Sequence, residues 1–170
     1  MKTLILMRHA KSSWDDLALP DHERPLNSRG RRSATLLGDW LRAKGHLPDQ
    51  VISSDSLRTR ETFERLNLGM GAEFIPALYH ADPLVMLSVL KQATGDSVLM
   101  LGHNPGIARF AADLVMSAPA HWRFAQYPTC ATMVAQFELD HWSKLRWGAG
   151  KLIDFVIPRE LPESFRQADK

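Results

Sequence analysis

Residues 3–9 read Thr-Leu-Ile-Leu-Met-Arg-His, the most informative stretch of the chain. A short apolar run of this kind is typical of a buried strand. The run ends in Arg8 and His9, two adjacent groups that can both carry positive charge, and packing alone does not explain them. A second apolar run, residues 98–101, leads into Gly102 and His103, and Arg58 follows a third. Basic side chains therefore recur where predicted buried strands end.

Strand and helix signals alternate along the whole chain. Strands are predicted at residues 2–7, 50–54, 73–76, 97–101, 131–139 and 151–157, and helices at about 28–45, 55–68, 83–94 and from Asn104-Pro105 onward. Asp55 and Asp82 are the predicted N-caps of the second and third helices. This alternation indicates βαβ units and a three-layer α/β sandwich with a mainly parallel sheet, in which a later strand can form an antiparallel edge. With 170 residues, one domain spanning 1–170 is expected.

The predicted topology brings distant residues together. Right-handed crossovers place the carboxyl ends of parallel strands at one edge of the sheet, which is where ligands bind in open α/β folds. His9, Arg58, His80 and His103 all follow predicted strands. We therefore expect these four side chains to meet. The polar loop at residues 10–28 is long for a small domain, and such loops are often functional.

The composition excludes several classes of protein. A net charge of +2 gives no reason to expect nucleic-acid or membrane binding by the chain as a whole. The N-terminal apolar run is too short for a signal peptide, no stretch approaches a membrane span, and a cytoplasmic location is expected. Four arginines crowd one segment: Arg24, Arg29, Arg31 and Arg32. A solvated helix start is the favoured interpretation, and a docking patch for an acidic partner is the alternative.

Three segments carry a resemblance to a known family. Residues 6–14, Leu-Met-Arg-His-Ala-Lys-Ser-Ser-Trp, resemble the RHG-type signature of the histidine phosphatase (phosphoglycerate mutase-like) superfamily, with Ala10 where many members have glycine. Residues 53–62 resemble its second motif, and Gly102-His103-Asn104 its third. Residues 26–30 resemble the helix-opening segment between the first two. The Arg-His-Ala-Lys-Ser form and the His-Asn-Pro-Gly run are similar to SixA-type phosphohistidine phosphatases in particular.

The chemistry of these residues suits phosphoryl transfer. A neutral imidazole at His9 can attack phosphorus through one ring nitrogen, while the other nitrogen donates to a backbone carbonyl. Arg8 and Arg58 can give bidentate hydrogen bonds to the phosphoryl oxygens. His103 would add a third positive donor if it is protonated. Further expected donors are the helix opened by Asn104, and the hydroxyl groups of Ser12 and Ser53.

The residue at the position expected for a general acid indicates the class of substrate. Many relatives that cleave alkyl phosphate esters carry a glutamate just after the third strand, where this chain has His80. An alkoxide needs a strong general acid to leave, because the pKa of its conjugate acid is near about 15.7, whereas an imidazole leaving from phosphohistidine needs far less help. His80 is thus a candidate proton donor, or alternatively a residue of the site wall. The missing glutamate favours a phosphoramidate substrate.

The resemblance implies a phosphatase that needs no cofactor and works through a phospho-His9 intermediate. Its implied substrate is phosphohistidine on a protein, such as a histidine-containing phosphotransfer domain of a signalling relay. With a single predicted helix, residues 83–94, between the third and fourth strands, no lid is expected. The alternatives are a small-molecule phosphomonoesterase, a less favoured mutase and a phosphate-binding module without turnover. A zinc site at His9 and His103 is disfavoured, since close-spaced ligand pairs are missing and the arginines oppose a cation.

Overall fold

The structure is a computed structural model, and it describes residues 1–162. The strands are β1 (Lys2–Arg8), β2 (Gln50–Ser54), β3 (Glu73–Ile75), β4 (Ser97–Gly102), β5 (Thr132–Phe137) and β6 (Lys151–Val156). The α-helices are α1 (Ser28–Lys44), α2 (Leu57–Leu66), α3 (Pro83–Leu90) and α4 (Gly106–Leu114). Four 3₁₀ turns connect them: η1 (Asp21–Glu23), η2 (Pro76–Leu78), η3 (Trp142–Lys144) and η4 (Pro158–Glu160).

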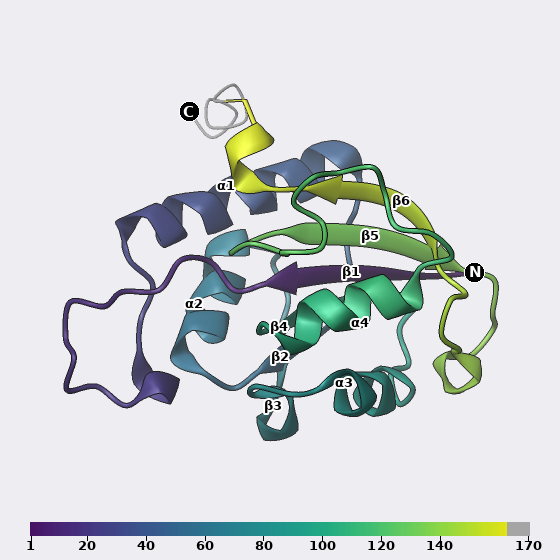
Figure 1. Cartoon of the computed structure of the whole chain (residues 1–170), viewed down its shortest axis with the longest axis horizontal. Helices are drawn as coiled ribbons and strands as arrows, with labels where there is room; N and C mark the ends of the chain where they lie inside the picture. The colour runs from purple at the N-terminus through teal and green to yellow at the C-terminus, as the bar shows by residue number, and fades with distance from the viewer. Residues whose placement is uncertain (163–170) are drawn as a thin grey trace.

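The strands form one six-stranded sheet in the order β3-β2-β4-β1-β5-β6. The first four strands of that order run parallel, while β5 pairs antiparallel with both β1 and β6. The mainly parallel sheet is confirmed. The strand that runs against the others is β5, and it is not at the edge of the sheet as expected, because β6 pairs with it on the side away from β1 (Figure 1).

Helices cover both faces of the sheet, so the three-layer architecture is confirmed (Figure 1). Successive residues of a strand point to opposite faces, and β1 uses both of them. Leu4 and Leu6 pack in the core with α3 and α4, whereas Ile5 and Met7 pack in the core with α1 and α2. A strand that is buried on both sides must be apolar throughout, which explains the unbroken apolar run that leads to Arg8.

Two of the predicted helix starts differ in outcome. Asp82 caps α3 as predicted, since its Oδ1 accepts from Val85 N at 3.0 Å. The prediction for Asp55 was wrong, because the side chain of Ser56 caps α2 instead. Helix α3 also ends at Leu90, four residues earlier than expected.

The sheet places the two histidine-bearing strand ends side by side. Strands β1 and β4 are neighbours, with Arg8 opposite Gly102, so His9 and His103 follow adjacent strands at the same edge. The loop after β1 is held against the first turn of α1 at Gly30. A Cβ atom at Gly30 would lie 2.1 Å from the carbonyl oxygen of Lys11, so only glycine permits this approach.

Candidate active site

His9 lies directly after β1 and is buried, with 6% of its surface exposed. Its Nδ1 lies 2.7 Å from the carbonyl oxygen of Ala10, and because a carbonyl can only accept, Nδ1 carries the ring proton. Burial, together with Arg58 and Arg8, lowers the pKa of His9 to about 3. The ring is therefore neutral at physiological pH, with an unprotonated Nε2 that can act as a nucleophile.

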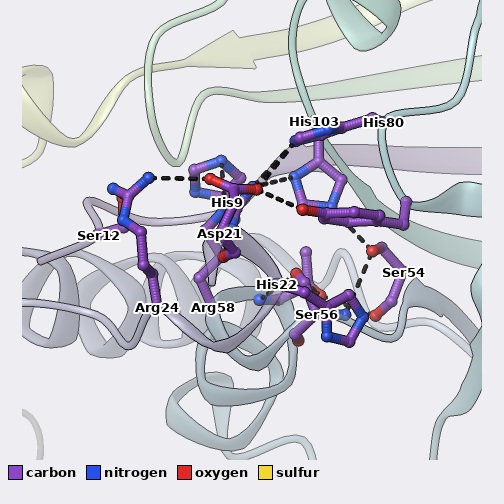
Figure 2. A network of polar contacts seen from close by, with 12 residues as sticks. His9, Ser12, Asp21, His22, Arg24, Ser54, Ser56, Arg58, His80 and His103 are labelled. Carbon is purple, nitrogen blue, oxygen red and sulfur yellow. Dashed lines mark hydrogen bonds and ion pairs between the residues drawn. The ribbon is translucent and has the colours of Figure 1, made fainter. Parts of the chain in front are cut away.

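Arg58 lies in the first turn of α2, and its guanidinium contacts the other side chains of the site. Its Nε lies 3.4 Å from Nε2 of His9, and its Nη2 lies 3.1 Å from Nε2 of His80 and 3.4 Å from Nδ1 of His103. The four residues expected to meet at the carboxyl edge of the sheet are thus brought together (Figure 2). Arg58 is only 3% exposed, so its guanidinium is a largely desolvated cation at the centre of the cluster.

Asp21 supplies the carboxylate of the cluster, and no sequence motif pointed to it. It lies in η1, and Arg58 donates from Nη1 to its carbonyl oxygen at 2.7 Å and from Nη2 to its Oδ2 at 3.0 Å. The Tyr79 hydroxyl donates to the same Oδ2, and Nε2 of His80 lies 3.4 Å from it. Burial tends to raise the pKa of Asp21, but the hydrogen bonds from Tyr79 and Arg58 outweigh it and hold that pKa well below its usual range.

His103 faces Arg58 with one ring nitrogen and Ser54 with the other. Its Nε2 lies 2.8 Å from Ser54 Oγ, and its Nδ1 accepts from Arg58, so Nε2 carries the proton. Burial is the largest cause that lowers the pKa of His103, to about 2, and His9 and Arg58 add to it. The suggestion of a protonated His103 therefore does not hold for the site without an anion.

Arg8 contrasts with Arg58 in having few partners. It ends β1, and its Nη1 donates to the carbonyl oxygen of Tyr127 at 3.3 Å. Its Nε is buried and has no hydrogen-bond partner among the described residues. Burial and the neighbouring Arg58 lower the pKa of Arg8 from its usual value. Most donors of this guanidinium are thus unpaired within residues 1–162.

Arg24 corrects the interpretation of the arginine-rich segment as a solvated helix start. It is 7% exposed, and its guanidinium lies 3.3 Å from the ring centre of Trp14. Its Nη2 donates to Ser12 Oγ at 2.5 Å and its Nη1 to Asp21 Oδ1 at 3.0 Å. Arg24 therefore ties the loop after β1 to η1. Ser12 lies in the pocket as predicted, with its hydroxyl engaged by Arg24.

Comparison with known proteins agrees with this geometry. The family model described as histidine phosphatase superfamily (branch 1) matches residues 4–79. An uncharacterized protein of Mycobacterium tuberculosis is 34% identical over 161 residues, which is 90% of this chain and 100% of the relative. A candidate SixA phosphohistidine phosphatase from Nakamurella multipartitia superposes with a TM-score of 0.77 at 28% identity, covering 92% of this chain and 96% of that one.

The chain belongs to the histidine phosphatase superfamily. It is of the SixA type, and the SixA structures extend the likeness to the whole fold. The protein histidine phosphatase SixA complexed with tungstate superposes with a TM-score of 0.77 over 94% of this chain and 99% of that one, and at 24% identity it supports the fold alone. The coarse activity that follows from this membership is that of a phosphatase.

The pocket of this histidine phosphatase has a volume of about 340 Å³. It is lined by Arg8, His9, Lys11, Ser12, Trp14, Arg24, Arg58, His80, His103, Asn104 and Thr129. Between β3 and β4 the chain forms only η2 and α3. No aspartate or glutamate side chain from residues 1–162 lines this pocket, which suits an anionic substrate.

Two predicted phosphate donors have other partners. Ser53 is fully buried and donates from Oγ to the carbonyl oxygen of Ser54, and it does not line the pocket. Asn104 lines the pocket, but its amide donates to the carbonyl oxygens of Gln126 and Tyr127, while its Oδ1 accepts from Ala108 N. Asn104 therefore anchors the segment before β5 to the start of α4.

His22 had no assigned role, yet it lies beside the site. Its Nε2 lies 2.8 Å from Asp55 Oδ1, and its ring packs edge-on against Tyr79. Sequence reasoning missed four residues that lie at the site: Asp21, His22, Arg24 and Tyr79. The first three lie in the long loop between β1 and α1, away from any strand end, and Tyr79 lies after β3, where only His80 was considered. The proline-flanked loop at residues 10–28 was the signal that could have found three of them. Among the described residues no group of His, Cys, Asp and Glu side chains is placed to hold a metal ion, and no helix is long and apolar enough to cross a membrane.

Proposed function

We propose that this phosphatase hydrolyses phosphohistidine on a protein through a covalent phospho-His9 intermediate. The observation that carries the proposal is the absence of a proton-bearing carboxyl group in the pocket formed by residues 1–162. Asp21 is the nearest carboxylate to Arg58, and hydrogen bonds keep it ionised. A site without a carboxylic acid is poorly equipped to protonate an alkoxide, but it can release an imidazole.

In the first step, Nε2 of His9 attacks phosphorus in line with the P–N bond of the substrate. The His9–phosphorus bond forms as the P–N bond breaks, and the leaving imidazole takes a proton. Arg58 and Arg8 hold the equatorial oxygens, where charge stabilisation matters most in phosphoryl transfer. His80 is the proposed source of that proton, since its side chain lines the pocket beside Arg58.

In the second step, water attacks the phosphoryl group on His9. The His9–phosphorus bond breaks, inorganic phosphate leaves, and Nε2 of His9 regains its lone pair. The hydrogen bond from Nδ1 to Ala10 is compatible with both steps, because it holds the ring orientation and stabilises positive charge on the phosphorylated ring.

His103 changes its protonation state in this mechanism. Without an anion its Nδ1 faces the Arg58 guanidinium, and the ring is neutral. A phosphoryl group with two negative charges, placed between them, would favour the imidazolium form by direct electrostatic attraction. Nδ1 of His103 then becomes a donor to a phosphoryl oxygen, so binding of the substrate takes up a proton.

A phosphorylated protein is the proposed partner, with a histidine-containing phosphotransfer domain as the leading class. The likeness to SixA-type phosphohistidine phosphatases supports this proposal. So does the short connection between β3 and β4, which leaves the site accessible to a side chain on a protein surface. A phosphotransfer domain as substrate would place this enzyme in a signalling relay.

The test compares a phosphohistidine peptide with a sugar phosphate on wild-type enzyme. We expect kcat/KM for the peptide to exceed that for the sugar phosphate by about 10² or more, the lower end of what a general acid contributes. His9→Ala should abolish both turnover and the alkali-stable phosphoenzyme, whereas His141→Ala, at an exposed histidine far from the cluster, should change neither. Undiminished turnover in His9→Ala would overturn the mechanism, and a preference for the sugar phosphate would favour a small-molecule phosphomonoesterase.

A further inference from the structure

A second cavity, of about 580 Å³, adjoins the catalytic pocket. Arg8, Lys11 and Thr129 line both of them. The second cavity is lined by six basic side chains, Arg8, Lys11, Arg29, Arg32, Arg123 and Arg159, and by no acidic side chain of the described residues. We call it the basic groove. It is larger than the catalytic pocket, and the mechanism uses only Arg8 from it.

The cations of the basic groove are unpaired within residues 1–162. Arg24, Arg42 and Arg58 each form an ion pair with an aspartate, whereas none of the six groove side chains pairs with an acidic side chain of residues 1–162. The Nε atoms of Arg8 and Arg123 are buried and have no hydrogen-bond partner in the described part of the chain. Like charges gathered around a concave surface repel one another and attract anions, so this surface favours a negatively charged ligand.

The distribution of the cations indicates which kind of anion fits. They come from four segments. Arg8 and Lys11 lie at the end of β1 and in the loop after it, Arg29 and Arg32 lie in α1, Arg123 lies in the chain before β5, and Arg159 lies in η4. Figure 1 shows η4 resting against α1 at this side of the molecule. Lys11, Arg29, Arg32 and Arg159 are exposed around the rim, and buried Leu36 and Ile157 contribute apolar surface. A single phosphate needs donors that converge on one point, whereas cations spread around a partly apolar groove match several separate carboxylates.

We propose that the basic groove binds an acidic segment of the phosphoprotein, so that carboxylates near the phosphohistidine guide it into the catalytic pocket. This proposal rests on the proposed function. The opposite side of the pocket supports it, because Asp21 neutralises Arg58 there and offers no comparable attraction for carboxylates. An acidic segment would therefore bind on one side of the scissile group, which gives the substrate a defined orientation. The docking alternative for the arginine-rich segment is thus favoured for Arg29 and Arg32.

The test uses two phosphohistidine peptides that differ only in glutamate or glutamine at the positions flanking the phosphohistidine. Wild-type enzyme should prefer the glutamate peptide by about five- to tenfold in kcat/KM, mainly through KM, since each exposed ion pair contributes little. The double variant Arg32→Glu with Arg159→Glu should lose this preference and hydrolyse the glutamine peptide at the wild-type kcat. Equal rates on both peptides with wild-type enzyme, or a preference that survives in the double variant, would overturn the proposal.

A matched control makes the same change in net charge at the opposite end of the strands, away from the pocket. Arg146 and Lys151 are exposed, and β6 begins at Lys151 opposite Gln136, near the N-terminal end of β1. Arg146→Glu with Lys151→Glu should keep the preference for the glutamate peptide. Loss of the preference in this control as well would show an effect of net charge, and would contradict a role for the groove.

Binding of hexaglutamate separates this proposal from the proposed function, because it requires no turnover. At low ionic strength, titration calorimetry should detect binding to wild-type enzyme and to the control variant, and weaker or no binding to the groove variant. If neither peptide is hydrolysed, the proposed function fails. Hexaglutamate binding then still tests whether the basic groove binds an acidic segment. Failure of hexaglutamate to bind wild-type enzyme would overturn the groove proposal, as would binding of pyrophosphate alone, which indicates a small polyphosphate ligand.

Discussion

Arg58 and Arg8 lie on two sides of the same pocket, and they are held in different ways. Arg58 has a partner for each of its nitrogen atoms, including the carboxylate of Asp21 and the ring nitrogens of His9, His80 and His103. Within residues 1–162, the Arg8 side chain has one hydrogen bond, to the carbonyl oxygen of Tyr127. The Arg58 guanidinium is therefore held in a fixed orientation before substrate binds. The Arg8 guanidinium has N–H groups that are free to bind the substrate. A donor fixed in advance contributes most to stabilising a transition state.

The largest expected effect comes from removing each arginine in turn. Arg58→Ala should lower kcat/KM on a phosphoramidate by about 10³-fold and Arg8→Ala by about 10²-fold, the range for one preorganised donor. The difference reflects the fixed orientation of Arg58. Steady-state kinetics, with Tm as a check on folding, measure both variants. A loss in Arg8→Ala as large as that in Arg58→Ala would break the comparison.

Acid stability should depend on His9 and His103, the two buried histidines beside Arg58. His9 and His103 have folded pKa values of about 3 and about 2, below the unfolded value of about 6.5. The unfolded chain therefore binds more protons than the folded chain below about pH 6.5, and the free energy of unfolding should fall as pH drops from there toward about 3. Urea unfolding between pH 7 and pH 4 measures the slope. His103→Asn should reduce it, and an unchanged slope would contradict the buried neutral state of His103.

Two tyrosine substitutions compare the residues that support each arginine: Tyr127 contacts Arg8, and Tyr79 contacts the Asp21 carboxylate that binds Arg58. The Tyr127 hydroxyl is buried, donates to the Leu6 carbonyl oxygen at 2.5 Å and accepts from Met133 N at 3.1 Å. Tyr127→Phe leaves both groups unsatisfied and should lower the free energy of unfolding by about 1–3 kcal/mol. Tyr79→Phe, at a half-buried residue, should cost less than about 1 kcal/mol and alter kcat instead, since Tyr79 binds Asp21. Chemical denaturation measures both, and the reverse order would contradict this account.

Neutralising Asp21 should affect turnover less than removing either arginine does. Asp21→Asn removes a carboxylate that competes with the phosphoryl group for Arg58, so inorganic phosphate should inhibit more tightly. Arg58 also becomes less well oriented, so kcat should fall by about tenfold. The matched control is Asp55→Asn, because Asp55 contacts His22 and makes no ion pair with Arg58. If phosphate inhibition weakens in Asp21→Asn, the carboxylate does not compete for Arg58.

Much of the site could be predicted because the ends of buried strands can be recognised in a sequence. The apolar runs before His9 and His103 must be apolar to be buried on both faces, so the first polar residue after each marks the carboxyl edge of the sheet. Arg58 was found in the same way, one helical turn after β2. Ser53 was misplaced because alternation in a strand sends adjacent residues to opposite sides, and Ser54 is the serine that contacts His103.

The amino-acid sequence alone was enough to predict the architecture, the family, and the histidine and two arginines that line the pocket. These features depend on local periodicity and on short motifs, which the chain order preserves. Only the tertiary structure decided the partners of those residues. Asp21 and Arg24 reach the site from η1 and the chain after it, and Arg123 and Arg159 reach the basic groove from segments more than 60 residues after Arg58. Contacts of this kind arise from the packing of loops, and no periodic pattern in the chain records them.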